Sequence, residues 1–150
     1  MRIAIDLNVL LDVAQNRAAF YQDSEEVLAR ARRGEYEGVI SGHLVTTFYY
    51  LVAKFAGAAT ASIAVDGLLT DFAVVGADKQ ILAKARKLAM KDFEDGVVAA
   101  TADSSSCDYI VTRNAPDFAG SPVPAITPED FLKLLPPRAP GQTASGHVGN

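Results

Sequence analysis

Four aspartates have the spacing of a shared site: Asp6 and Asp12 near the N-terminus, and Asp95 and Asp117 towards the other end. Asp6 directly follows the apolar segment 1–5, which has the character of a buried strand. An open α/β sheet binds its ligand beyond the carboxyl ends of its strands, so carboxylates delivered there by two strands would form one negative pocket. Such a pocket is typical of a site for Mg²⁺ or Mn²⁺, which take oxygen ligands together with waters.

The composition is that of one globular domain. The chain has 150 residues, of which 49% are hydrophobic, and this is enough to bury a core. No apolar run reaches the roughly 18 uninterrupted residues of a membrane span, and Asp6 and Asp12 interrupt anything like a signal-peptide core. The single cysteine, Cys107, allows no internal disulfide and indicates a reducing compartment, so we expect a cytoplasmic protein. His43 and His147 lie far apart with no cysteine at zinc spacing, which argues against a zinc site.

The net charge of the chain does not exclude a nucleic acid as its ligand. A net charge of −4 is unlike the basic surface of a dedicated nucleic-acid-binding module. It is compatible with a nuclease, because a bound metal inverts the local sign of a carboxylate site. Basic residues gather at 30–33 and at 79–91. Two interpretations of these clusters stay open: solvated helix faces, or a rim around the acidic pocket that tracks phosphates.

The elements that would position the acids alternate between strands and helices. We expect strands at 1–5, 38–41, 72–75, 107–112 and 123–126. We expect helices at 8–20, from Asp23 towards Gly34, and at 42–55, 58–69, 79–90, 93–105 and 128–132. Strands separated by helices imply parallel pairing through right-handed crossovers, so the fold class is α/β. Residues 1–135 form the expected domain, and the Pro-, Gly-, Ala- and Ser-rich residues 136–150 are expected to be a disordered tail.

Helix geometry directs Asp95 towards the core. With Asp92 as the N-cap, Asp95 is the third helical residue and shares a stripe with the apolar residues that follow at spacings of three, four and seven. Neighbouring Glu94 points elsewhere, and we expect it to be an ordinary acid of the first turn. Other roles stay open: Asp95 as a partner of the helix dipole, Asp6 as a cap of the next turn, and Asp12 as a solvent-facing helix residue.

Three segments occur in an order and spacing that indicate a family. Residues 3–12 read IAIDLNVLLD, residues 95–102 read DGVVAATA, and YIVTRNAPDF at 109–118 is followed by TPEDF at 127–131. Together they resemble the PIN domain family, and in particular the toxin ribonucleases of VapBC-type toxin–antitoxin pairs. The resemblance covers about residues 1–134. It implies a three-layer α/β/α fold with a central parallel sheet of about five strands and helices on both faces.

The resemblance also implies an activity: a Mg²⁺- or Mn²⁺-dependent endoribonuclease with RNA as its substrate. It implies that Asp6, Asp95 and Asp117 are metal ligands, and Asn114 stands where many members carry a further acid. In the mechanism that we expect, Asp95 or Asp117 orients the attacking water as the general base, and Arg113 contacts the scissile phosphate. A surface ion pair stays open as the alternative for Arg113. The residues implied to support these ligands are Asn8, Asp12 and Thr47.

One position departs from the family pattern. The usual second acid, a Glu, falls six residues after Ser41, where this chain has Thr47. One subgroup of the family lacks that Glu, and three carboxylates with neutral oxygens suffice for one Mg²⁺. Two other functions stay open. One is a catalytically weak or inactive PIN fold that binds RNA or protein, and the other is a haloacid-dehalogenase-like phosphatase with Asp6 as its nucleophile. The phosphatase would require an Asp where Asn8 stands.

The middle of the chain points to a partner protein. Residues 42–70 are poor in charge, and aromatic and aliphatic side chains crowd the helix expected at 42–55. A helix that is apolar on nearly all sides must be buried, and one domain of this size cannot easily bury every face. We therefore expect a homodimer through the helices of residues 42–70. The family resemblance implies a cognate antitoxin as a further partner over the same region.

Overall fold

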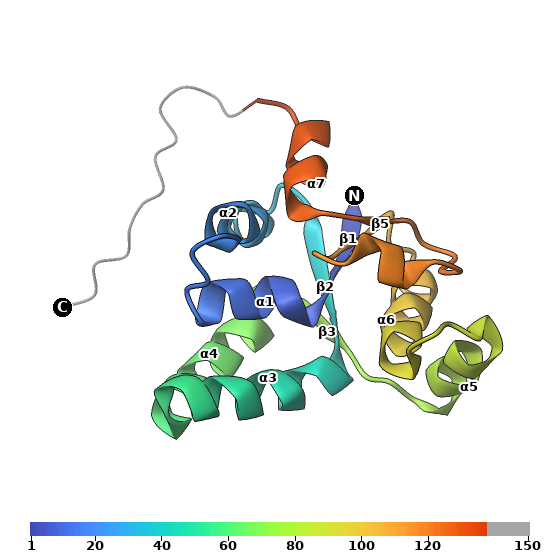
Figure 1. Ribbon diagram of the computed structural model, residues 1–150, viewed down its shortest axis with the longest axis horizontal. Coiled ribbons are helices and arrows are strands. Elements are labelled where there is room, and N and C mark those ends of the chain that lie inside the picture. The colour runs from blue at the N-terminus through green and yellow to red at the C-terminus, as the bar shows by residue number, and fades with distance from the viewer. Residues whose placement is uncertain (138–150) are drawn as a thin grey trace.

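Five short strands form one parallel sheet at the centre of the protein, in a computed structural model that describes residues 1–137 (Figure 1). The strands are β1 (Arg2–Ile5), β2 (Glu37–Ser41), β3 (Ala73–Val75), β4 (Tyr109–Val111) and β5 (Ala125–Ile126). They stand in the order β3-β2-β1-β4-β5, and each neighbouring pair is parallel. The expected α/β class with a parallel sheet of five strands is confirmed. The tail expected at 136–150 lies outside the described residues except for its first two.

Helices cover both faces of this sheet. In Figure 1, α1 to α4 lie on one side of the strands and α5 and α6 on the other, which gives the three expected layers. No helix within residues 1–137 has the length and apolar character needed to cross a membrane. The helices are α1 (Leu7–Ala14), α2 (Tyr21–Arg32), α3 (Gly42–Ala56), α4 (Ala58–Asp71), α5 (Lys79–Leu88), α6 (Phe93–Ser104), α7 (Pro128–Leu134) and the short 3₁₀ helix η1 (Ala115–Phe118).

The strand order places the crevice of the sheet between β1 and β4. The chain leaves β1 towards β2 on one side, and only much later adds β4 on the other side. Connections that leave in opposite directions create a gap beyond the carboxyl ends of the two strands, and ligands of open α/β sheets bind there. Asp6 follows β1 at this point, and Thr112 follows β4.

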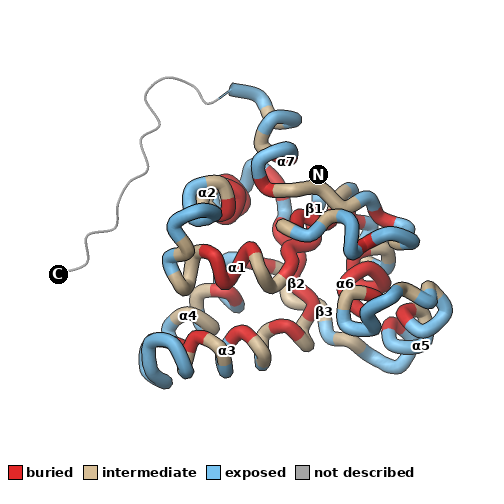
Figure 2. The backbone as a smooth tube through the Cα atoms, viewed as in Figure 1, coloured by how far each residue is buried: buried red, intermediate tan, exposed pale blue. Residues whose placement is uncertain are grey.

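The helices α5 and α6 each begin directly after an aspartate that caps them. Asp78 accepts the N–H of Ile81 at 2.9 Å, and Asp92 accepts the N–H of Asp95 at 3.0 Å. Figure 2 shows the buried residues along the strands and α6, with exposed residues on the outer side of α5. The two helices pack closely, since a Cβ added at Gly96 would lie 3.4 Å from the carbonyl oxygen of Ala85. The backbones of α5 and α6 therefore come close to one another at Gly96.

The boundaries of α1 and α2 differ from the expected ones. The first helix ends at Ala14 instead of continuing to residue 20, and α2 begins at Tyr21 rather than after Asp23. Ser24 lies inside α2, and its hydroxyl donates to a carboxylate oxygen of Asp12 on α1, at 2.9 Å. This hydrogen bond joins α2 to α1.

Candidate active site

A cavity of about 260 Å³ opens beyond the carboxyl ends of β1 and β4. Segments far apart in the sequence contribute its polar lining, and they come from the start of α1, from α3, from the start of α6 and from η1 with the residue before it. Each residue that the resemblance implied as a metal ligand lines this cavity, as do two of the three implied supporting residues. The polar lining consists of Asp6, Asn8, Thr47, Glu94, Asp95, Asn114 and Asp117.

Asp6 is held rigidly at the floor of the site. One carboxylate oxygen accepts the backbone N–H of Leu7 at 2.8 Å, so Asp6 also caps α1. The other accepts the hydroxyl of Thr112 at 2.8 Å. Burial raises the pKa of Asp6, while these two hydrogen bonds act in the opposite direction. The capping role is therefore compatible with a ligand role, because each oxygen keeps lone pairs in addition to the one that it uses.

Thr112 is a fully buried residue of the site that sequence reasoning missed. Its hydroxyl donates to Asp6 and lies 3.3 Å from the donating amide nitrogen of Asn8. It also accepts the backbone N–H of Asn114 at 3.1 Å. One hydroxyl thus fixes the end of β1, the first turn of α1 and the loop after β4. The available signal was its position at the carboxyl end of a buried strand, where Asp6 also stands.

Asp95 has the most perturbed carboxyl group of the cavity. Its pKa is raised to about 6, first by partial burial and then by the negative charges of Asp6, Asp92, Asp117 and Glu94. Acids that raise one another's pKa are close enough to repel, and a bound cation would relieve that repulsion. A second cavity of about 270 Å³, lined by Lys91 and three acids, shares Asp95 and Asp117 with the first. The acidic region therefore continues towards Lys91.

The donor set fits a hard cation that is held partly through water. Within residues 1–137, no three His, Cys, Asp or Glu side chains are grouped closely enough to hold a metal ion by themselves. Mg²⁺ requires only one or two carboxylates and keeps several waters, and the cavity offers carboxylates, amide oxygens and a hydroxyl. Zinc prefers three or four nitrogen, sulfur or oxygen ligands in a tight tetrahedral shell, which this cavity does not supply.

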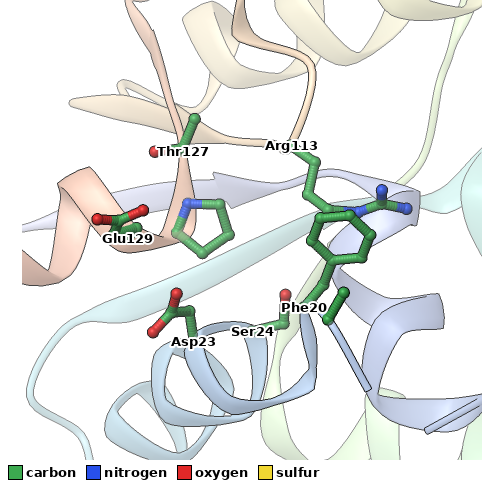
Figure 3. A pocket seen from close by; sticks show the side chains of 8 residues that line it. Phe20, Asp23, Ser24, Arg113, Thr127 and Glu129 are labelled. Atoms are coloured by element: carbon green, nitrogen blue, oxygen red, sulfur yellow. The ribbon is translucent and has the colours of Figure 1, made fainter. Parts of the chain in front are cut away.

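Arg113 directs its guanidinium away from the acidic cavity. Its backbone N–H donates to the side-chain oxygen of Asn8 at 3.2 Å, which ties the chain to the site. Its Nε lies 2.9 Å from a carboxylate oxygen of Asp12, and its guanidinium carbon lies 4.1 Å from the centre of the Phe20 ring. Figure 3 shows Arg113 and Phe20 in a separate cavity that Thr127 also lines. This cavity has a volume of about 250 Å³. The phosphate contact implied for Arg113 does not match this side-chain direction.

Asp12 lies behind the site and does not line it. The residue is 0% exposed, so the alternative of a solvent-facing helix residue is wrong. Its carboxylate accepts the hydroxyl of Ser24 and pairs with Arg113 and, at 3.6 Å, with Arg17. These contacts fasten α1 to α2 and to the loop after β4. Asp12 therefore supports the segment that carries Asn114 and Asp117, without touching the cavity.

Two further polar residues near the site were not anticipated. Glu94 was expected to point elsewhere, and this expectation is wrong because it lines the cavity. Its carboxylate lies 3.9 Å from Nε2 of His43, whose Nδ1 is 2.7 Å from the hydroxyl of Ser41. Burial lowers the pKa of His43, while Glu94 and Asp6 act in the opposite direction. Ser41 ends β2, so the rule that found Asp6 at a strand end could also have pointed to this corner.

Comparisons with known proteins agree on the fold. A family model of the PIN domain matches residues 2–115. No curated protein matches the chain significantly. Among solved structures, a chain of the DNA-bound VapBC from Salmonella typhimurium is 16% identical, with a TM-score of 0.67, over 85% of this chain and 98% of that one. A chain of a toxin–antitoxin complex from Klebsiella pneumoniae is 20% identical, with a TM-score of 0.63, over 84% and 97%.

A third similar structure comes from Mycobacterium tuberculosis. It is VapC20, a toxin that cleaves the sarcin–ricin loop, and it is 14% identical to this chain with a TM-score of 0.61. The match covers 72% of this chain and 86% of that one. At such identities the three likenesses show a shared fold.

Proposed function

Because the chain belongs to the PIN domain family, we propose that it is a Mg²⁺- or Mn²⁺-dependent endoribonuclease and the toxin of a toxin–antitoxin pair. The observation that carries this proposal is the cavity at the switch point of the sheet, which Asp6, Asp95 and Asp117 all line. The fold shared with VapBC toxins supports the assignment to a toxin with a cognate antitoxin.

In this proposal the residues of the cavity have distinct tasks. Asp6, Asp95 and Asp117 would hold the cation, and Asn114 would add a neutral oxygen. When bound, the cation would polarise the scissile phosphate and lower the pKa of a water molecule. A carboxylate oxygen of Asp95 or Asp117 takes the proton of the attacking water, as a general base within the cavity. The hydroxyl of Thr112 keeps Asp6 in place while this happens.

Cleavage of RNA by the purified wild-type protein tests the proposal. We expect cleavage with Mn²⁺ or Mg²⁺ and none with EDTA, because the carboxylates alone repel a phosphate. RNA binding without cleavage under both conditions would favour the inactive binding fold. Hydrolysis of a small phosphoester but not of RNA would favour the phosphatase. Asn8 argues against that enzyme, because its amide hydrogen-bonds Thr112 and the backbone of Arg113 where a catalytic acid would be needed.

The position of the missing family acid gives a direct test of the metal site. Thr47 lines the cavity, so Thr47→Glu should add a carboxylate there and tighten Mn²⁺ binding. One more close charge at a partly hydrated site supplies about 1–3 kcal/mol, or roughly five- to hundredfold in affinity. Calorimetric titration with Mn²⁺ measures this apart from turnover. The matched control is Thr46→Glu, which adds the same charge to an exposed neighbour on the same helix.

A tighter site in the Thr46→Glu protein as well would show that general charge, and not the position of Thr47, is responsible. Unchanged or weaker Mn²⁺ binding by a correctly folded Thr47→Glu protein would mean that this part of α3 contributes no ligand position. In that case the cation would be held from the α1, α6 and η1 side of the cavity alone.

The helical pair α3 and α4 is the proposed homodimer surface. The two helices pack against each other, but large apolar side chains stay exposed on them: Tyr50 at 61%, Phe55 at 60%, Ile63 at 73% and Leu69 at 56%. Exposed apolar groups gathered on one projecting pair of helices mark an interaction site. The antitoxin would use the neighbouring part of the same surface.

Sedimentation should show a dimer at tens of micromolar, a concentration that matches about −6 to −8 kcal/mol of association. Ile63→Glu should shift the protein towards monomer, because a buried interface does not tolerate an unpaired carboxylate. The matched control is Leu82→Glu, at an exposed apolar position on α5, which should leave the dimer intact. A wild-type protein that is monomeric at these concentrations would contradict the proposal.

A further inference from the structure

Four basic side chains on α5 and in the turn after it have no ion-pair partner within residues 1–137. They are Lys79, Arg86, Lys87 and Lys91, which belong to the second basic cluster of the sequence. Elsewhere in this described part of the chain, every Lys or Arg except Lys54 forms a salt bridge with an acid. Positive charge that is not neutralised inside the protein is therefore concentrated in one short stretch of a chain whose net charge is −4.

Helix geometry places three of these side chains on one outward face. At about 100° per residue, Lys79 and Arg86 lie almost in line and Lys87 lies beside them. All three are exposed. The opposite side of α5 is buried against α6 through Ile81 and Ala85. The strip is about 10 Å long from Lys79 to Arg86, at a rise of about 1.5 Å per residue.

The outward face leads directly to the acidic cavity. The last turn of α5 contains Arg86 and Lys87, and the chain then turns at Ala89 and reaches the N-cap of α6. Lys91 lies within this turn and lines the cavity that contains Asp95 and Asp117. Positive groups therefore continue from the surface of α5 to the edge of the proposed site.

We propose that Lys79, Arg86, Lys87 and Lys91 form a basic strip that binds the phosphate backbone of single-stranded RNA next to the acidic cavity. The inference rests on the proposed function, from which it takes RNA as the ligand. A cavity lined by carboxylates repels a polyanion, so a substrate needs attraction from another part of the surface. The basic strip supplies this attraction. Because the strip continues to the proposed catalytic cavity, we favour a nucleic acid over an acidic protein segment as its ligand.

Salt dependence of RNA binding tests the strip. Fluorescence anisotropy with a short labelled single-stranded RNA is measured in EDTA, where cleavage cannot deplete the ligand, for wild type and for Lys87→Gln/Lys91→Gln. Each phosphate contact on a single strand contributes about 0.7 to the slope of log K against log salt. The double variant should lower the slope by about 1.4, which corresponds to about 25-fold weaker binding at ~0.1 M salt.

The matched control is Lys84→Gln/Lys133→Gln. This variant also removes two positive charges, one of them from α5. Both of its lysines, however, are already paired with acids. We expect its slope to stay closer to that of wild type than the slope of Lys87→Gln/Lys91→Gln. Equal slopes for the two double variants would overturn the proposal, and so would a wild-type protein that binds no RNA at low salt. Displacement of RNA by polyglutamate at equal charge concentration would also overturn it, because it would identify a general anion surface.

Cleavage is measured separately with Mn²⁺, so the two proposals can fail independently. If the wild-type protein never cuts RNA but its binding depends on Lys87 and Lys91, the nuclease proposal fails and the basic strip stands. If the wild-type protein cuts RNA but its binding is indifferent to these lysines, the strip fails and the nuclease stands. Thermal unfolding of Lys87→Gln/Lys91→Gln should match that of wild type, because both lysines are exposed and form no ion pair within residues 1–137. The control variant should unfold at a slightly lower temperature, because it loses surface pairs with acids.

Discussion

Asp95→Asn is expected to lower cation-dependent RNA cleavage by at least about a hundredfold, which corresponds to about 2.7 kcal/mol of transition-state stabilisation. The substitution keeps the shape of the side chain and removes its charge, so the proposed site loses a metal ligand and a candidate base together. Initial rates with saturating Mn²⁺ measure the loss. A variant that cleaves at the wild-type rate would contradict the assignment of Asp95.

The same substitution should stabilise the protein in EDTA. The pKa of Asp95 is raised from its ordinary value of 3.8 to about 6, so the folded state binds the proton more tightly than the unfolded state does. The stability of the wild-type protein therefore falls as the pH rises from about 4 to about 6, and above that it stays at the lower level. The amide that replaces the carboxyl group does not titrate, so the advantage of the variant should open within this window and persist at neutral pH.

A matched control for both measurements is Asp103→Asn. It makes the same change on the same helix, at a residue that pairs with Lys84 and lies away from the cavity. Cleavage should be unaffected, and stability in EDTA should fall slightly instead of rising, because a favourable pair is lost. If Asp103→Asn reduced cleavage as strongly as Asp95→Asn, the loss would reflect damage to α6 and not the chemistry of the cavity.

Arg113→Ala is expected to destabilise the protein by about 2–4 kcal/mol. Breaking a buried ion pair by removing one partner costs about 3–5 kcal/mol, and the range is reduced here because Arg113 keeps some contact with solvent. The carboxylate of Asp12 would stay fully buried with only Ser24 and the more distant Arg17 as partners. The contact with the Phe20 ring would also be lost. Urea denaturation measures the change in the free energy of unfolding.

Arg33→Ala serves as the control, since Arg33 forms surface pairs with Glu26 and Glu35. We expect a change below about 1 kcal/mol there. The alternative for Arg113 is the phosphate contact that we expected from the sequence. It would be supported if Arg113→Ala kept wild-type stability and lost cleavage. Destabilisation with near-normal cleavage of the folded fraction would assign Arg113 to the support of the site.

The positions of the carboxylates could be predicted because they follow from backbone rules. Asp6 ends a strand, and Asp95 lies on the inward stripe of a helix whose cap, Asp92, is evident in the sequence. Both rules depend only on residues close in the chain, and the cavity does contain both side chains. The alternation of strands and helices likewise gives the sheet without knowledge of any side-chain contact.

Side-chain directions set by distant partners could not be predicted in this way. Arg113 stands next to the site in sequence, but its guanidinium turns towards Asp12, which lies far earlier in the chain. Thr112 is as typical of an ordinary strand end as of a residue that orients a ligand. Ser24 donates to Asp12 on another helix, a contact that the local pattern around the expected helix start at Asp23 does not show. In each case the direction of a polar side chain depends on a partner that lies far away in the sequence.

The position of β1 in the middle of the sheet sets the order in which a growing chain can assemble the proposed site. β1 is synthesised first, but its hydrogen-bonded neighbour β4 comes from the last third of the chain. Asp6 likewise has no hydrogen bond from Thr112 until that residue, 106 positions later, has been synthesised. Domains fold as units while synthesis proceeds from the N-terminus. A ribosome-bound chain that ends after α4 therefore lacks Asp95 and Asp117, and one edge of β1 is unpaired. The strand order delays the assembly of the proposed RNA-cutting site until translation of the domain is nearly complete.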